Sequence, residues 1–266
     1  MEQIRLCMTD IDGTFLRQDK SCPALNVEAV KELRKKGIKF GIATGRSATI
    51  LPKLFEEWGL AGDVDYIVGS NGAEVVDCRL QTAKEQFFLS AEKLHDITKK
   101  FKHFDASLCV YEGATLVADK STFYYRQRCE AVHLQQKITC LEDYIQHSYP
   151  KMLIVSSPQE QQRILAYQTE LGCKDFKMVA SSDTLLEVID PELSKVKGIL
   201  QLCGQLQIEK EQVLCFGDEM NDFEMLSTFT GVCVSNAIEE IKAISAYQTT
   251  SCDVGGVGRF IIDYLL

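Results

Sequence analysis

Short apolar runs alternate with amphipathic stretches over residues 1–78. In the stretch that ends at Gly37, Val27, Val30 and Leu33 recur at helical spacing and share one face. The apolar runs are short enough for buried strands and read IRLCMT, IKFGIAT and DYIVGS. Because strands and helices take turns along the chain, this part predicts βαβ units that form a parallel sheet.

The same alternation returns over residues 188–266. A helical pattern carries Ile199, Leu202 and Leu206 on one face, and the strand-like runs QVLCFG and GVCVS come after it. Residues 79–187 differ in pattern: helical stretches around residues 93–102 and 160–171 separate the strand-like runs SLCVYEG, ATLVADK, KMLIVSS and FKMVASSDTLLEVI. We therefore predict an α/β protein. It has a Rossmann-like, doubly wound parallel sheet core, residues 1–78 and 188–266, and an inserted α+β domain, residues 79–187.

Polar residues and glycines follow the predicted parallel strands at the point where each strand ends. They are Asp10 and Asp12; Thr44, Gly45 and Arg46; Asn71 and Gly72; Asp218, Asn221 and Asp222; and Ser235 and Asn236. In an open parallel sheet, ligands bind in the crevice beyond the carboxyl ends of the strands, so carboxylates from both ends of the chain would converge there. A cation has to offset such clustered negative charge, and hard oxygen ligands suit Mg²⁺. Asp10, Asp12 and Asp218 are therefore predicted to form a Mg²⁺ site.

Composition and charge limit the partners of the protein. A formal net charge of −9 and a pI near 5.1 argue against a nucleic-acid or anionic-membrane binder, because such proteins usually present a basic field. The 11 cysteines are scattered, odd in number and partly inside apolar runs, which is typical of reduced thiols in a cytoplasmic protein. We find no signal-like segment and no apolar run of membrane-spanning length, and we expect a monomer or a weak homo-oligomer.

The chain resembles the haloacid dehalogenase (HAD) superfamily in four segments, in particular its Cof-type phosphatases with an inserted α/β cap of the C2 type. The segments are DIDGT (Asp10–Thr14), IATGR with Thr44, SKVKG with Lys195, and GDEMND (Gly217–Asp222). SNGA and SNAIEEIK also look like family segments. The resemblance covers nearly the whole chain and implies a HAD-like core domain, with residues 79–187 as the cap domain.

The third of these segments offers two candidates for the lysine of the family. The family usually reads Lys-Gly at this point, whereas this chain offers Lys195 followed by Val196, or Lys197 followed by Gly198. Helical phase favours Lys195, because it keeps the apolar positions of the following helix where the family has them. Lys197 remains the alternative.

The resemblance implies a phosphohydrolase mechanism. Asp10 would attack phosphorus and form an aspartyl-phosphate, and Asp12 would act first as general acid and then as general base. Mg²⁺ would be bound by the side chains of Asp10 and Asp218 and by the carbonyl of Asp12. Asp222 would orient these ligands.

The same resemblance implies how the phosphoryl group is bound. Mg²⁺ and Lys195 would neutralise its charge. The Thr44 hydroxyl, the Gly45 amide and the Asn221 side-chain amide would hold its oxygens. For Arg46, an ion pair at a helix start and a role in the site stay equally open.

The predicted function is that of a Mg²⁺-dependent phosphohydrolase that dephosphorylates small phosphorylated metabolites, sugar phosphates or similar monoesters. The inserted domain would be a mobile cap that excludes water. Two alternatives stay open: a phosphomutase, which passes the phosphoryl group to another hydroxyl, and a non-catalytic phosphate-ligand sensor. Because all four expected chemical types are present, at Asp10, Asp12, Lys195 and Asp218, the enzyme is favoured.

Overall fold

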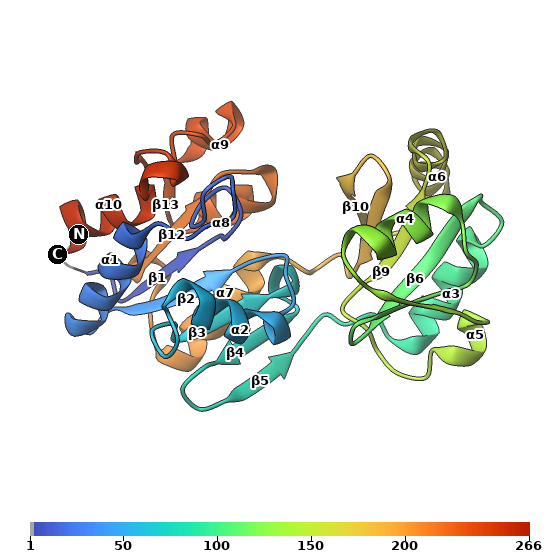
Figure 1. Cartoon of the computed structure of the whole chain (residues 1–266), viewed down its shortest axis with the longest axis horizontal. Coiled ribbons are helices and arrows are strands. Elements are labelled where there is room, and N and C mark those ends of the chain that lie inside the picture. Colours follow the sequence, from blue (N-terminus) through green and yellow to red (C-terminus); the bar gives the residue numbers. More distant parts are fainter. Residues whose placement is uncertain (1–2) are drawn as a thin grey trace. The chain divides into compact units, whose positions relative to one another are not determined.

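The computed structural model describes residues 3–266, which form two compact units (Figure 1). The core unit combines residues 3–86 with Leu193–Leu266, and the cap unit comprises Phe87–Glu192. The chain therefore passes from one unit to the other a few residues beyond each predicted boundary. At the first boundary the reason is a hairpin strand, β5 (Thr82–Glu85), which pairs with β4 (Glu74–Asp77) in the sheet of the core unit.

The core unit is built on an eight-stranded sheet with the order β14-β13-β12-β1-β2-β3-β4-β5. Six strands pair in parallel, and β4 and β5 add an antiparallel hairpin at one edge. The parallel strands are β1 (Leu6–Thr9), β2 (Lys39–Ala43), β3 (Tyr66–Gly69), β12 (Val213–Gly217), β13 (Thr230–Cys233) and β14 (Tyr247–Gln248).

Helices cover both faces of this sheet. On β1, Cys7 packs into one apolar cluster, with Leu33 and Phe260, while its neighbour Met8 packs into the other, with Ile199. Successive side chains of a strand point to opposite faces, so a sheet covered on both sides needs strands that are apolar throughout. The predicted doubly wound fold is confirmed. Its helices are α1 (Ala24–Lys35), α2 (Leu51–Trp58) and α10 (Gly256–Leu265) on the first side, and α7 (Lys195–Leu206), α8 (Phe223–Thr228) and α9 (Glu239–Ile244) on the second.

The cap unit has a six-stranded sheet with the order β10-β11-β9-β6-β7-β8, antiparallel except for the β7–β8 pair. Its strands are β6 (Ala106–Glu112), β7 (Thr115–Ala118), β8 (Gln135–Ile138), β9 (Met152–Ser156), β10 (Lys177–Ser182) and β11 (Leu185–Ile189). Its helices are α3 (Ala91–Phe101), α4 (Phe123–Ala131), α5 (Leu141–Tyr144) and α6 (Pro158–Leu171).

One apolar run of the cap unit differs from its prediction. The run FKMVASSDTLLEVI forms a hairpin of β10 and β11 rather than a single strand. The turn is favoured locally, because the Thr184 amide donates to the Ser182 hydroxyl at 3.3 Å.

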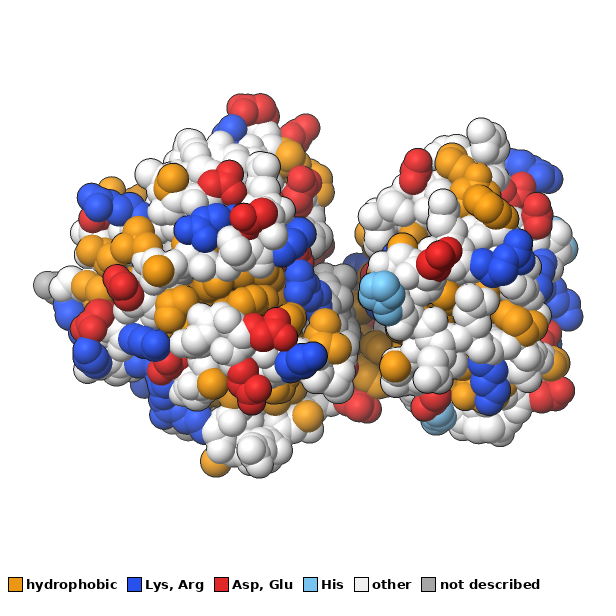
Figure 2. Space-filling view, viewed as in Figure 1, with side chains coloured by type: hydrophobic (Ala, Val, Ile, Leu, Met, Phe, Trp, Pro, Cys, Tyr) orange, Lys and Arg blue, Asp and Glu red, His pale blue; other side chains and the backbone are white. Residues whose placement is uncertain are grey.

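The surface in Figure 2 carries acidic and basic side chains interspersed on both units. Within residues 3–266, no helix is both long and apolar enough to cross a membrane. All 11 cysteines are free thiols.

Asn26 on α1 fixes the segment that follows β1. Its side-chain amide donates to the Phe15 carbonyl at 2.7 Å, and its Oδ1 accepts from the Gly258 amide of α10 at 2.7 Å. Asn26 is fully buried, so both bonds are made away from water. This bridge anchors the loop that carries the two predicted acidic residues Asp10 and Asp12.

We predict that Asn26→Ala lowers the free energy of unfolding by about 2–4 kcal/mol, because it leaves a buried carbonyl and a buried amide without partners. Urea denaturation of the two proteins measures the difference. Glu28→Ala, an exposed change on the same helix, is the control and is expected to stay within about 0.5 kcal/mol of wild type. An equal cost for the two variants would contradict the prediction.

Candidate active site

A buried ammonium joins two carboxylates at the carboxyl edge of the core sheet. Asp10 directly follows β1, and Lys195 is the first residue of α7. The Lys195 Nζ donates to Oδ1 of Asp10 at 2.6 Å and to Oδ1 of Asp222 at 2.7 Å. All three side chains are buried. Although burial acts to lower the pKa of Lys195, the two carboxylates outweigh it and hold this pKa above its usual value.

Asp222 is held in place by the segment that follows β12. Its Oδ2 accepts hydrogen bonds from the amides of Asp218 at 3.0 Å and Glu219 at 3.5 Å. A Cβ on Gly217 would lie 2.6 Å from Asp222, so the close approach of the backbone requires glycine. The turn η4 (Met220–Asp222) thus directs this carboxylate toward Lys195.

Three carboxylates come close enough together to share one ion. Asp10, Asp218 and Asp222 each offer an oxygen, and these oxygens lie within 4.8 Å of one another. The Thr14 hydroxyl donates to Oδ1 of Asp218 at 2.5 Å. Gly13 has φ +81°, and a Cβ there would lie 2.3 Å from Oδ2 of Asp218, so only glycine leaves room for this carboxylate. An all-oxygen set of this kind fits a small hard cation such as Mg²⁺.

The electrostatics of the cluster also favour a cation. Burial raises the pKa of Asp218 to about 6, even though the Thr14 hydrogen bond acts to lower it. Burial likewise raises the pKa of Asp10, with a further contribution from the Asp222 carboxylate and opposition from the Lys195 ammonium. Lys195 therefore offsets only part of the negative charge that is gathered here.

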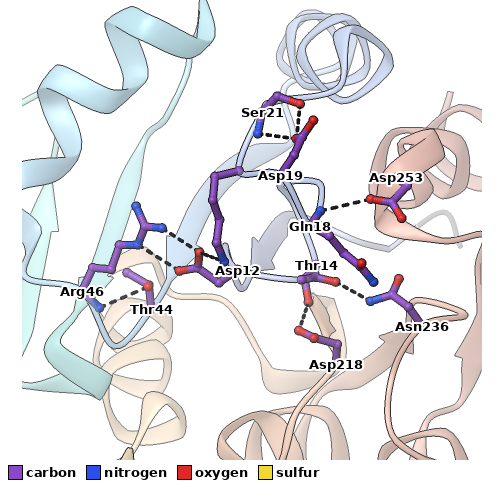
Figure 3. A network of polar contacts seen from close by, with 12 residues as sticks. Asp12, Thr14, Gln18, Asp19, Ser21, Thr44, Arg46, Asp218, Asn236 and Asp253 are labelled. Carbon is purple, nitrogen blue, oxygen red and sulfur yellow. Dashed lines mark hydrogen bonds and ion pairs between the residues drawn. The ribbon is translucent and has the colours of Figure 1, made fainter. Parts of the chain in front are cut away.

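The side chain of Asp12 makes different contacts (Figure 3). Arg46 binds it with two donors, Nε at 2.9 Å and Nη2 at 2.6 Å, and the Lys20 Nζ donates to it at 2.9 Å. Although partial burial acts to raise the pKa of Asp12, these hydrogen bonds outweigh it and lower the pKa. Arg46 thus forms an ion pair, and its partner is a predicted site residue. The predicted metal ligand of Asp12 is its backbone carbonyl, and that assignment stays a prediction.

Two contacts of this region come from residues to which the sequence assigned no role. Lys20 is an exposed lysine in the loop after Asp12, and no pattern in the sequence distinguishes it from other surface lysines. Asn236 follows β13, and its side-chain amide donates to the Gly13 carbonyl at 2.8 Å (Figure 3). Its place after a parallel strand is the signal that identifies it.

Apart from Lys195, the predicted phosphoryl-binding residues lie on two segments. Thr44 directly follows β2, the strand that pairs with β1, and is buried. Its hydroxyl accepts a hydrogen bond from the Arg46 amide at 3.2 Å. Gly45 follows it. Asn221 lies in η4 and is exposed.

The structure distinguishes the two lysines of the third segment. Lys195 is buried against Asp10 and Asp222, whereas Lys197 lies two residues further along α7 and is exposed. The Ser194 hydroxyl caps α7 by accepting from the Lys197 amide at 3.4 Å. Lys195 is therefore the lysine that joins the carboxylate cluster.

Comparison with known proteins identifies the family of the chain. Residues 7–261 match the family of haloacid dehalogenase-like hydrolases, and the chain belongs to this family. It is 24% identical to a 5-amino-6-(5-phospho-D-ribitylamino)uracil phosphatase of Bacillus subtilis (strain 168), over 267 residues that cover 97% of each chain. The predictions of a Cof-type HAD protein and of a hydrolase are confirmed.

Solved structures share the fold at lower identity. A haloacid dehalogenase-like hydrolase from Bacteroides thetaiotaomicron is 22% identical, with a TM-score of 0.85 over 98% of this chain and 99% of that one. A sugar phosphatase of HAD subclass IIB is 20% identical, with a TM-score of 0.77 over 98% of each chain.

Gly72 sets the position of the segment before Lys195. It has φ +107°, and a Cβ there would lie 2.1 Å from the Ser194 carbonyl oxygen. We predict that Gly72→Ala lowers the free energy of unfolding by about 2–4 kcal/mol, because backbone strain and a backbone clash add together. Urea denaturation measures the loss.

Gly37→Ala is the matched control. Gly37 also has a positive φ, +78°, but nothing lies within 4 Å of its Cβ position. The control isolates the conformational cost, which is about 1–2 kcal/mol. If both variants lose the same stability, the contact with Ser194 does not matter.

Proposed function

We propose that the protein is a Mg²⁺-dependent phosphohydrolase that releases phosphate from small phosphorylated metabolites, sugar phosphates or similar monoesters, through an aspartyl-phosphate. The observation that carries the proposal is the contact of Lys195 with Asp10 inside a cluster of three buried carboxylates. Membership of a hydrolase family supports it. The names of two similar proteins, a phosphatase of a phosphoribityl compound and a sugar phosphatase, support the substrate class.

Asp10 and Asp12 divide the chemistry between them. An oxygen of Asp10 forms a bond to phosphorus while the bond from phosphorus to the ester oxygen breaks, and that oxygen takes a proton from Asp12. Water then attacks the same phosphorus, gives its proton to Asp12, and releases Asp10 and inorganic phosphate. When bound by Asp10 and Asp218, Mg²⁺ supplies positive charge to the phosphoryl group and the crowded carboxylates.

Lys195 orients the nucleophile. Its bond to Oδ1 of Asp10 holds the plane of that carboxylate, and its ammonium offsets charge on the phosphoryl oxygens. The Thr44 hydroxyl, the Gly45 amide and the Asn221 side chain bind those oxygens, so the group is positioned for in-line attack.

The ion pairs of Asp12 suit one half of the reaction better than the other. Arg46 and Lys20 favour its ionised form, which can accept a proton from water. To donate a proton first, Asp12 has to exchange these partners for a proton as substrate binds.

We predict that the purified protein releases phosphate from p-nitrophenyl phosphate and from a panel of sugar phosphates when Mg²⁺ is present, and that EDTA abolishes the release. Asp10→Asn removes the nucleophile and is expected to lower kcat about a thousandfold or more. Colorimetric phosphate release measures both effects.

Asp263→Asn, an exposed aspartate on α10, is the control and keeps wild-type activity. Full activity of Asp10→Asn would contradict a mechanism in which Asp10 is the nucleophile. An isomeric sugar phosphate as product, with no free phosphate, would identify a mutase instead.

The metal can be tested without turnover. We predict that millimolar Mg²⁺ raises the melting temperature of wild type by a few degrees, because binding adds about RT ln(1 + [Mg²⁺]/Kd) to the free energy of unfolding. The melting temperature of Asp218→Asn should not change with Mg²⁺. The metal-free variant should melt no lower than metal-free wild type, because it lacks one of the crowded buried carboxylates. Differential scanning fluorimetry measures both shifts, and an equal Mg²⁺ effect on the two proteins would exclude Asp218 as a ligand.

A further inference from the structure

The turn after β3 has an unusual backbone. Ser70 and Asn71 both lie in the left-handed region, with φ 49° and 57°. Such conformations are uncommon for residues other than glycine and cost about 1–2 kcal/mol each, although asparagine tolerates them best. The turn lies at the carboxyl edge of the sheet, directly after a strand that pairs with β2.

Backbone hydrogen bonds tie this turn to the loop that carries Thr44 and Gly45. The Asn71 amide donates to the Thr44 carbonyl at 2.9 Å, and the Ser70 amide donates to the Arg46 carbonyl at 2.8 Å. Glu74 reinforces the link, because its Oε2 accepts from the Ser70 hydroxyl at 3.0 Å and from the Ala48 amide at 2.7 Å. None of these bonds uses the side chain of Asn71.

The side chain of Asn71 instead lies against Gly45. Its Oδ1 is 3.2 Å, and its Nδ2 3.4 Å, from the position that a Cβ on Gly45 would occupy. The Oδ1 is buried and has no hydrogen-bond partner among the groups of residues 3–266. A buried polar atom left without a partner costs about 1–3 kcal/mol, so native proteins rarely keep one without a use for it.

We propose that Asn71 is a further phosphoryl-binding residue, whose side-chain amide hydrogen-bonds the phosphate group of the substrate beside Gly45. The other end of the same amide, Nδ2, is a donor and lies 3.4 Å from the Cβ position of Gly45, so it is placed to donate to a phosphate oxygen there. Phosphate oxygens are acceptors, and Gly45 is already a proposed phosphate-binding residue. The inference rests on the proposed function and adds a donor from a further segment of the chain.

The strained turn then has a physical role. The left-handed backbone at residues 70 and 71 directs the side-chain amide of Asn71 toward Gly45. The backbone hydrogen bonds to Thr44 and Arg46 fix the distance between this turn and the loop that carries Gly45. Preorganised donors of this kind need no reorganisation when the ligand arrives.

Two variants separate the amide from the turn. Asn71→Gly keeps the left-handed backbone without strain and removes the side-chain amide. Asn71→Asp keeps the size and shape of the side chain but replaces its donor with a negative charge. We expect inorganic phosphate, titrated calorimetrically in the presence of Mg²⁺, to bind about tenfold more weakly to Asn71→Gly and at least as weakly to Asn71→Asp. KM for p-nitrophenyl phosphate should rise by a similar factor, with a smaller change in kcat.

Gln207→Gly is the matched control, because Gln207 is an exposed residue with φ 52° at the end of α7. It should bind phosphate as wild type does. Wild-type phosphate affinity in either Asn71 variant would overturn the inference, and since Asn71→Asp preserves size and shape, it decides the matter if Asn71→Gly does not fold. Failure of the proposed function looks different: wild type itself would neither bind nor release phosphate.

Discussion

The buried ammonium of Lys195 is the group on which the site depends. It lies 2.6 Å from Asp10 and 2.7 Å from Asp222, and so links β1, α7 and η4. Removal of one partner from a buried ion pair leaves an uncompensated charge, which costs about 3–5 kcal/mol. Because 185 residues separate Lys195 from Asp10 in the sequence, the chain has to bring β1 beside β12 and α7 before any chemistry can occur.

Close backbone approach is the second constraint. Gly13 leaves room for Asp218, Gly217 leaves room for Asp222, and Gly72 leaves room for the carbonyl before Lys195. At each of these positions a Cβ would come within 2.6 Å of its neighbour, which is closer than real Cβ contacts. Backbone packing thus holds the carboxylates of the site close together, and their mutual repulsion favours a bound cation.

Apolar patterning predicts the core well and the cap less well. In the core, β1 is buried on both faces, so Leu6, Cys7 and Met8 form an unbroken apolar run and helices have to cover both faces. In the cap, the hairpin of β10 and β11 reads as a single strand, because Ser182 and Thr184 differ little from residues of an exposed strand until the turn bond between them is known. The strand β5 is exposed at every position and has no apolar run to find, which explains the shifted domain boundary.

The residues that follow each parallel strand can be read from the chain, because strand direction alone decides which edge of the sheet they reach. Asp10, Thr44, Asn71 and Asp218 all come from this rule. Side-chain partners cannot be read in the same way. Helical phase selects Lys195 over Lys197, but its contacts with Asp10 and Asp222 depend on packing between segments far apart in the sequence. The same holds for the binding of Asp12 by Arg46 and Lys20. Local spacing carries no information about those distances.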